Sequence, residues 1–458
     1  MKTLITTALF FLAFTTFGQN AYTQDLFSFS VENDIEYGTA TNYVGNTESL
    51  KLDLYKPVGD DNCNRPCLVL VHGGAWVQGS KDDAGIVSVS EKLAAKGWVV
   101  AAIDYRLGTH KPAFYDSAYQ VCDYQLKCWN TSDSAEIFRA NYRGQQDTKG
   151  AIRFMKERHM LDSTDISNFF LLGESAGGFI SFAAAFLDDP SEKPMECGAL
   201  PNAPTPNSFL DECLPAGFST SRPDLGDING TVALNGYNTS VEGIGTFISG
   251  TFDVGMFSNT TDWPSIYMFH QGSDIVVAPG YFRLLARANT CFSLNNTCPP
   301  FQQFPCAHGS FSLNQFLTNL GSSVDIQFDY LSNSNGIPLD CVASGHSIDN
   351  INLRLQNMTD HFAQRIFDNG NTPSSTCTNS IDENANDNPE IYPNPSNGVI
   401  TVKLHPSHKQ LSLLSTEGKF IRSYEAQAVQ HLQLKSGVYF IQVVAENGQE
   451  WIKKIVVL

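Results

Sequence analysis

The sequence predicts an α/β domain, with a mostly parallel central sheet covered by helices on both faces, followed by a small all-β sandwich. Two observations support this fold class. Between about residues 49 and 370, short apolar segments rich in Val, Ile and Phe alternate with helical patterns, as expected of parallel strands buried on both faces. After a polar stretch, the last seventy or so residues contain short alternating segments separated by turn residues.

The elements of the α/β part follow from hydrophobic periodicity. The expected strands are Leu50–Leu54, Cys67–Val71, Trp98–Ile103, Phe169–Leu172, Val232–Leu234, Ile266–Phe269 and Val324–Tyr330. The expected helices are Asp82–Lys96, Gln145–Arg158, Ala176–Phe186, Tyr281–Asn289 and Asp349–Phe367. Three long segments are expected to be irregular, either as lids and binding walls or as tolerated surface loops; they are Gly108–Asn141, Asp188–Gly230 and Thr290–Phe311.

The composition changes after Asp368. Asn369–Asn388 is rich in Asn, Ser, Thr, Asp and Pro, which is typical of a solvated linker. The strands expected beyond it are Val399–Leu404, His431–Leu434, Val438–Val444 and Trp451–Val457. The predicted organisation is therefore a signal peptide at 1–18, an α/β domain at 19–369, a linker at 370–388 and a β-sandwich at 389–458.

The N-terminus has the pattern of a secretory signal peptide. Met1-Lys2 is followed by the apolar stretch Leu4–Phe17, and Thr16-Phe17-Gly18 places small residues where a signal peptidase cuts, after Gly18. A membrane anchor is the alternative, but the apolar run is short and no second basic flank follows it. We expect an exported protein.

Charge and hydropathy exclude several partners. The 458 residues contain 29 Lys and Arg against 47 Asp and Glu, a net charge of -18. This balance argues against nucleic acid and against anionic membranes, which both need basic patches. No internal apolar run reaches the roughly 18 residues of a membrane helix, so we expect no integral membrane segment once the signal peptide is removed.

Eleven cysteines in an exported chain permit disulfides. Spacing alone cannot fix the pairing. No paired C-x-x-C motif occurs, which disfavours zinc, and we expect neither a metal nor a cofactor. The pairs suggested by proximity are Cys63 with Cys67, Cys122 with Cys128, Cys197 with Cys213, Cys291 with Cys298 and, over a longer distance, Cys306 with Cys341, which leaves Cys377 unpaired.

A G-x-S-x-G motif follows the expected strand Phe169–Leu172. It reads Gly173-Glu174-Ser175-Ala176-Gly177-Gly178 and opens a helical pattern. In a strand–turn–helix context this motif forms a sharp turn that exposes a nucleophilic serine at the tip of a sheet. We therefore predict Ser175 as a nucleophile; the alternative is a glycine-rich connection with a solvent-facing serine.

A second glycine-rich segment, His72-Gly73-Gly74-Ala75-Trp76, follows the strand Cys67–Val71. Backbone N–H groups of Gly73 and Gly74, with that of Ala176, could form an oxyanion hole that stabilises a tetrahedral intermediate. We expect His72 to order this loop. Trp76 is a candidate substrate-binding residue, with packing as the alternative.

A serine nucleophile needs a base, and the base needs a carboxylate that orients it. The expected chain order after the serine is acid, then histidine. Asp274 lies just beyond the strand Ile266–Phe269, and His346 lies beyond Val324–Tyr330, so we predict Asp274 as the acid and His346 as the base. The alternatives are Asp253 and Asp340 for the acid, and His110, His159, His270, His308 and His361 for the base.

These motifs together resemble the α/β-hydrolase carboxylesterases, especially the branch related to hormone-sensitive lipase and bacterial feruloyl or acetyl-xylan esterases. The matching segments are His72–Trp76, Asp104–Leu107, Gly173–Gly178, Gly272–Asp274 and Gly345–His346. The resemblance implies an α/β-hydrolase fold and a serine carboxylesterase that acts through an acyl-enzyme. Secretion would then favour extracellular esters as substrates: polysaccharide side-chain esters, lipids or polyesters.

The sequence departs from this family in two places. Ala75 stands where many members have a third glycine, and an insertion at Cys291–Leu320 lengthens the distance between the acid and the base. Because of these departures, the resemblance does not identify the substrate. A serine peptidase of the same fold and a non-catalytic binding protein are the alternative functions.

The tail resembles the C-terminal sorting domain of type IX secretion cargo in Bacteroidota. The matching segments are Ile391–Gly398, Glu417–Lys419, Ser436–Phe440 and Lys454–Val457. The resemblance implies the type IX secretion machinery as a partner and a secreted or cell-surface location. A carbohydrate-binding sandwich is the alternative.

Overall fold

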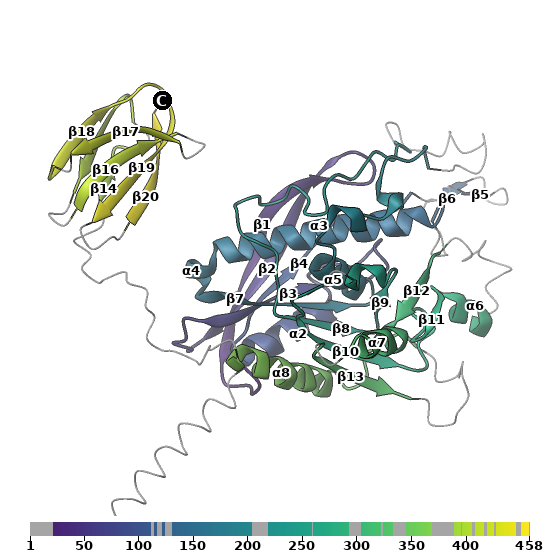
Figure 1. Cartoon of the computed structure of the whole chain (residues 1–458). Coiled ribbons are helices and arrows are strands. Elements are labelled where there is room, and N and C mark those ends of the chain that lie inside the picture. The colour runs from purple at the N-terminus through teal and green to yellow at the C-terminus, as the bar shows by residue number, and fades with distance from the viewer. Residues whose placement is uncertain are drawn as a thin grey trace, which may run out of the picture. The chain divides into compact units, whose positions relative to one another are not determined.

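The chain forms two compact units, Met1–Thr376 and Cys377–Leu458, which are described separately (Figure 1). The expected signal peptide and linker lie outside the described residues, and the predicted domain boundaries stay predictions. The computed structural model describes residues 22–110, 114–116, 121–123, 131–203, 219–258, 260–292, 304–321, 324–332, 345–368, 389–394, 396–404, 408–415, 419–425, 427–445 and 450–457.

An eight-stranded sheet forms the centre of the first unit, in the order β1-β2-β4-β3-β7-β8-β10-β13. The strands from β4 to β13 run parallel to one another, whereas β2 is antiparallel to both β4 and β1. This arrangement confirms the predicted fold class. The strands are β1 Ser28–Thr41, β2 Thr47–Val58, β3 Arg65–Val71, β4 Val99–Ile103, β7 Thr164–Glu174, β8 Gly243–Phe247, β10 Ser265–Gln271 and β13 Ile326–Leu331.

Helices cover both faces of this sheet (Figure 1). Residues of α2 and α8 share one apolar cluster, and residues of α3, α5 and α7 share the other. None of the helices in the described residues is both long enough and apolar enough to span a membrane. The helices are α2 Ala84–Ala95, α3 Ala135–Glu157, α4 His159–Asp162, α5 Ala176–Phe186, α6 Ala286–Phe292, α7 Ser310–Asn319 and α8 Ile351–Asp368.

Short elements lie within the connections between these strands and helices. They are the strands β5 Phe114–Asp116, β6 Val121–Asp123, β9 Gly250–Thr251, β11 Tyr281–Arg283 and β12 Cys306–Gly309, and the 3-10 turns η1 Pro190–Glu192, η2 Met195–Cys197 and η4 Gly255–Phe257.

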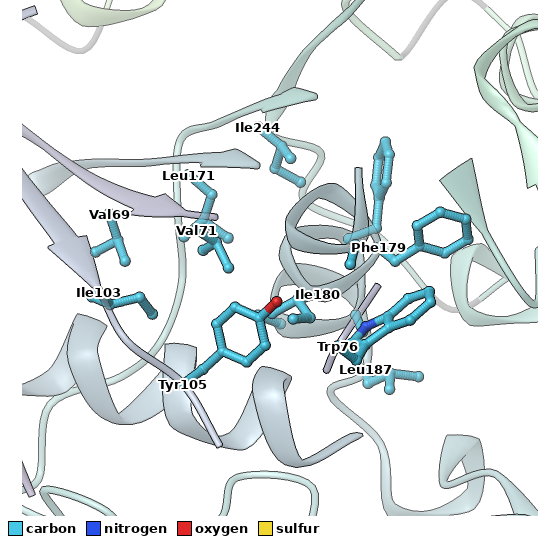
Figure 2. Packing of buried hydrophobic residues seen from close by; sticks show 14 of the residues in the cluster. Val69, Val71, Trp76, Ile103, Tyr105, Leu171, Phe179, Ile180, Leu187 and Ile244 are labelled. Carbon is cyan, nitrogen blue, oxygen red and sulfur yellow. The ribbon is translucent and has the colours of Figure 1, made fainter. Parts of the chain in front are cut away.

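Strand β3 shows how the sequence forms the two-sided core. Val69 and Val71 lie in the cluster on the α5 face, whereas Leu68 and Leu70 lie in the cluster on the α2 face. Successive side chains of a strand point to opposite faces, so a continuous apolar run is buried on both sides. Figure 2 shows Val69 and Val71 on the face that packs against α5.

One expected strand is wrong. Val232–Leu234 forms turns, and the parallel strand in this part of the chain is β8. Its sequence, Gly-Ile-Gly-Thr-Phe, gives a weak strand signal because glycine disfavours strands. The packing explains the glycines: a Cβ on Gly243 would lie 2.6 Å from Phe170, and one on Gly245 would lie 2.5 Å from Met358 of α8.

Two expectations about helices and loops also need correction. The expected helix Tyr281–Asn289 is instead β11 followed by α6. The expected irregular segment Gly108–Asn141 contains the first turns of α3, which begins at Ala135. These turns were missed because they carry buried polar side chains, among them Glu136 and Arg139, rather than an apolar stripe.

The cysteine pairs suggested by proximity are largely wrong. Cys67, Cys197 and Cys306 are free thiols, which rules out the pairs that contain them. Burial raises the pKa of Cys197 to about 12, and it also raises the pKa of Cys67, so both are inert apolar side chains at neutral pH. Cys63 and Cys291 are disulfide-bonded. Cys128, Cys213, Cys298, Cys341 and Cys377 lie outside the described residues.

The second unit is a β-sandwich, as predicted. Its two antiparallel sheets have the strand orders β14-β15-β18 and β17-β16-β19-β20. Ile400 and Leu432 of the first sheet share one core with Leu411, Ile441 and Val443 of the second. The strands are β14 Glu390–Tyr392, β15 Val399–Lys403, β16 His408–Leu414, β17 Phe420–Glu425, β18 Val429–Gln433, β19 Gly437–Ala445 and β20 Glu450–Val457.

Candidate active site

Ser175 occupies a sharp turn between β7 and α5. Its backbone has φ +51° and ψ −120°, a strained conformation for a residue with a side chain. Its N–H donates to the carbonyl of Phe247 (2.9 Å), which ties the turn to β8. A Cβ on Gly177 would lie 2.1 Å from the carbonyl oxygen of Val71, so only glycine lets α5 begin this close to β3.

The structure brings Ser175, His346 and Asp274 together. The Nε2 atom of His346 lies 2.8 Å from Oγ of Ser175. The Nδ1 atom of His346 lies 2.8 Å from Oδ2 and 3.0 Å from Oδ1 of Asp274. Because Nδ1 faces a carboxylate, it carries the proton in the neutral ring and leaves Nε2 free to accept from the serine hydroxyl.

Asp274 lies in the turn after β10 and is fully buried. Its Oδ1 accepts the N–H groups of Val276 (2.9 Å) and Val277 (3.0 Å). Burial alone would raise the pKa of this carboxyl, but the charge of His346 and hydrogen bonds from His270 and His346 outweigh it and lower the pKa below its usual value. Asp274 is therefore a carboxylate at neutral pH.

The glycine-rich loop after β3 lies against the turn that carries Ser175. A Cβ on Gly73 would lie 3.3 Å from Cβ of Ser175. The carbonyl oxygens of His72 and Gly73 both accept from the Tyr105 hydroxyl (3.2 and 3.4 Å). In a trans peptide the N–H points opposite to the carbonyl, so the N–H groups of Gly73 and Gly74 point away from Tyr105.

His72 orders this loop from within. Its Nδ1 donates to the carbonyl of Gly73 (2.7 Å), and its ring stacks on Tyr105 with centroids 4.4 Å apart. Burial lowers the pKa of His72, so the ring is neutral at neutral pH. With no hydrogen-bond partner for its buried Nε2, His72 fits a supporting role rather than that of a base.

Trp76 is placed in the core, which favours packing over substrate binding. Its side chain is 3% exposed. The ring packs against Phe179 and Phe252, and Nε1 donates to Oδ1 of Asn141 (3.1 Å). Figure 2 shows Trp76 beside Phe179 among the buried side chains.

The rival bases and acids have other partners. Nδ1 of His110 lies 3.0 Å from Glu136, Nδ1 of His308 lies 2.9 Å from Ser312, and Nδ1 of His159 contacts the carbonyl of Lys156 (3.0 Å). His361, on α8, lies 3.7 Å from Asp325. Asp253 accepts the N–H of Gly255 (2.7 Å), and Asp340 lies outside the described residues.

His270 is a rival base by sequence, but in the structure it contacts the acid, Asp274. Its Nε2 lies 3.3 Å from Oδ2 of Asp274, and the side chain is fully buried. The sequence signal for this contact is the spacing His-x-x-x-Asp at the end of an apolar strand. Glu174 also lies near the site: burial raises the pKa of its carboxyl, and the charge of His346 partly offsets this rise.

Two regions of the chain match family models. Residues 52–125, which contain β3 and the glycine-rich loop, match the family described as BD-FAE. Residues 390–458 match the family described as Secretion system C-terminal sorting domain. Both matches confirm the resemblances drawn from the motifs.

Two curated relatives each match part of the chain. The chain is 39% identical over 66 residues to "Esterase LipC" of Mycobacterium tuberculosis, which covers 14% of this chain and 16% of that protein. It is 30% identical over 162 residues to "Probable carboxylesterase 16" of Arabidopsis thaliana, which covers 32% of this chain and 34% of that protein. The chain thus spans about a third or less of the length of these relatives.

Solved structures of esterases are similar over a larger share of the chain. Thermogutta terrifontis esterase 2 phosphoramylated by tabun has 16% identity and a TM-score of 0.35, and the match covers 76% of this chain and 97% of that one. Esterase B from Lactobacillus rhamnosis with a tributyrin phosphonate inhibitor has 14% identity and a TM-score of 0.39, and the match covers 81% and 99%.

The chain therefore combines a domain of the α/β-hydrolase fold, part of which matches the BD-FAE family, with a C-terminal secretion sorting domain.

Proposed function

We propose that this chain is an exported serine carboxylesterase in which Ser175 is the nucleophile, His346 the general base and Asp274 the orienting acid. The observation that carries the proposal is the continuous contact from Ser175 Oγ to His346 Nε2 (2.8 Å) and from His346 Nδ1 to Asp274 (2.8 Å). These residues come from three separate parts of the chain, and serine hydrolases use this arrangement to activate a hydroxyl.

The mechanism proceeds through an acyl-enzyme. Ser175 Oγ attacks the ester carbonyl while His346 Nε2 takes its proton. The negative charge that develops on the carbonyl oxygen is stabilised by the N–H groups of Gly73, Gly74 and Ala176. His346 then protonates the leaving alcohol, and a water molecule that His346 deprotonates releases the acid and restores Ser175.

The substrates that fit this proposal are extracellular esters: polysaccharide side-chain esters, lipids or polyesters. The names of the matched relatives, an esterase and a probable carboxylesterase, favour esters over peptides. The sorting domain supports export through the type IX secretion machinery after the signal peptide at 1–18 is removed, to the medium or the cell surface.

The test is hydrolysis of p-nitrophenyl acetate, butyrate, longer acyl esters and a feruloyl ester by the full chain, with Ser175→Ala as the control. We expect one or more esters to be hydrolysed and Ser175→Ala to lose at least about 10³-fold in kcat. A fluorophosphonate probe should label the wild type and not the variant. Ester hydrolysis that survives in Ser175→Ala would remove Ser175 from the mechanism.

The same assays on the wild type separate the alternative functions. Faster cleavage of aminoacyl amides than of acyl esters by the wild type would indicate a serine peptidase. A folded protein that neither hydrolyses esters nor reacts with the fluorophosphonate would indicate a non-catalytic binding protein.

A further inference from the structure

A buried chain of hydrogen bonds joins the candidate acid to the candidate nucleophile by a second route. His270 lies against Asp274 through Nε2 (3.3 Å to Oδ2), and its Nδ1 accepts the backbone N–H of Ser310 (3.3 Å). Ser310 Oγ donates to the carbonyl of Ser249 (3.0 Å), and Ser249 Oγ donates to the carbonyl of Ser175 (2.7 Å). His270, Asp274, Ser310 and Ser249 have no exposed surface.

The hydrogen-bond partners of His270 determine which of its ring nitrogens carries the hydrogen. Nε2 faces two acceptors, the carbonyl of Val277 (2.9 Å) and Oδ2 of Asp274, so Nε2 carries the hydrogen. Nδ1 receives the N–H of Ser310 (3.3 Å) and is therefore the acceptor. In a neutral His270 the Nε2 hydrogen is thus shared between the Val277 carbonyl, at the shorter distance, and Asp274, while Nδ1 accepts from the first residue of α7.

We propose that His270 is a positioning residue that holds the Asp274 carboxylate in line with His346 and, through Ser310 and Ser249, fixes it relative to the backbone of Ser175. This inference rests on the proposed function. The chain of contacts links the end of β10, the start of α7 and the connection between β8 and β9 to the turn that carries the nucleophile.

The geometry explains why the acid needs this support. Asp274 lies in a turn beyond β10, and its Oδ1 is fixed by two backbone N–H groups. Its Oδ2 is shared by His346 and His270. Without the donor from His270, only His346 itself would hold Oδ2, and a misplacement of about 1 Å can cost about 10² in rate.

Sharing one oxygen also has an electrostatic consequence. A donor from His270 stabilises the negative charge on Asp274 and so reduces the attraction that remains for a protonated His346. Removal of this donor should favour protonated His346 and move the acid limb of the pH–rate profile to higher pH. Among the described residues, the other charged groups that face the site are Glu174, next to His346, and Arg287, whose guanidinium donates to the carbonyls of Gly272 (2.8 Å) and Asp274 (3.2 Å).

The test compares His270→Asn with His270→Gln in the full chain. The Gln amide nitrogen can reach the position of Nε2 and keep the donor to Asp274, whereas Asn reaches only the position of Nδ1. We expect His270→Asn to lower kcat by about 10²-fold with little change in KM. We also expect it to raise the midpoint of the acid limb of kcat/KM by roughly half a pH unit. His270→Gln should retain most of the activity and the wild-type midpoint.

Ser310→Ala is a matched variant at the residue that contacts Nδ1 of His270. It leaves His270 Nε2 on Asp274 and keeps the backbone N–H on Nδ1, so we expect a smaller loss in kcat and an unchanged midpoint. Urea unfolding of each variant shows whether a loss reflects unfolding. Equal losses in His270→Asn and His270→Gln, or an unmoved midpoint in His270→Asn, would overturn the proposal.

A measurement without turnover separates this inference from the proposed function. In protein labelled with ¹⁵N-histidine, the imidazole resonances of His346 follow its protonation by NMR. We expect their midpoint to move to higher pH in His270→Asn and not in His270→Gln, even if the wild type hydrolyses no ester and resists the fluorophosphonate. An identical midpoint in all three proteins contradicts the positioning role.

Discussion

The two sides of Ser175 are built in different ways. On the His346 side, side chains from three separate segments meet, and the buried carboxylate of Asp274 is paired at both oxygens. On the Gly73 side, one short loop presents backbone groups, with positive φ at Gly74, Ala75 and Trp76. The first side therefore depends on the chemistry of particular side chains, whereas the second depends on the space around the backbone. Substitutions can test each dependence separately.

The largest effect is expected on the side-chain side. Asp274→Asn keeps the shape of the acid but can present an N–H to His346 and so favour the wrong tautomer. We expect kcat to fall by about 10⁴-fold with KM little changed. Steady-state kinetics on the best p-nitrophenyl ester measure this, and a loss below tenfold would show that Asp274 does not orient the base.

The backbone side should respond to an added methyl group. Gly74 has φ +103°, and a Cβ there would lie 2.0 Å from the carbonyl oxygen of Gln78. Gly74→Ala should displace the N–H groups of the loop and lower kcat by about 10²–10³-fold.

Gly45→Ala is the matched control for that substitution. Gly45 also has positive φ (+93°), but a Cβ there would meet nothing within 4 Å. Gly45→Ala should keep the wild-type kcat. If both variants lost activity equally, backbone strain at a distance rather than the clash at Gly74 would be responsible.

A substitution of Trp76 tests whether its side chain supports the loop by packing or contacts the substrate. Trp76→Phe removes the donor to Asn141, whose side chain is largely buried, and should cost about 1–3 kcal/mol of unfolding free energy. Urea unfolding measures this cost. KM for acetyl and feruloyl esters should stay within about twofold; a selective rise for the feruloyl ester would restore Trp76 as a substrate-binding residue.

The smallest expected effect is a pH dependence carried by His72. Burial keeps its pKa in the folded protein below the value of about 6.5 that it has in an unfolded chain. Below that pH the unfolded chain binds the extra proton, so the wild type loses stability as the pH falls, by up to about 1.4 kcal/mol per unit. His72→Asn should lack this contribution, so the difference in unfolding free energy between the two proteins should narrow from pH 7.5 to 5.5. A constant difference contradicts a neutral buried ring.

Local motifs predicted the turn that carries the candidate nucleophile and the glycine-rich loop beside it. The glycines around Ser175 and those after β3 are consecutive in the chain, and each reports a backbone constraint that no other residue satisfies. Asp274 and His346 followed from strand order, since the ends of parallel strands meet at one edge of a sheet. Strand β8 was missed because Gly243 and Gly245 are dictated by Phe170 and Met358, which are distant in sequence.

Hydrophobic periodicity and local turn chemistry by themselves determined the α/β architecture, the β-sandwich and the position of Ser175 in the turn after β7, because those features depend on neighbours along the chain. Only the tertiary structure decided which histidine faces the serine and which supports the carboxylate. His270 and His346 are the same residue type, and both touch Asp274, but only one reaches Ser175. That distinction rests on distances across the folded sheet, where burial and shared hydrogen bonds, rather than residue identity, assign each ring its proton.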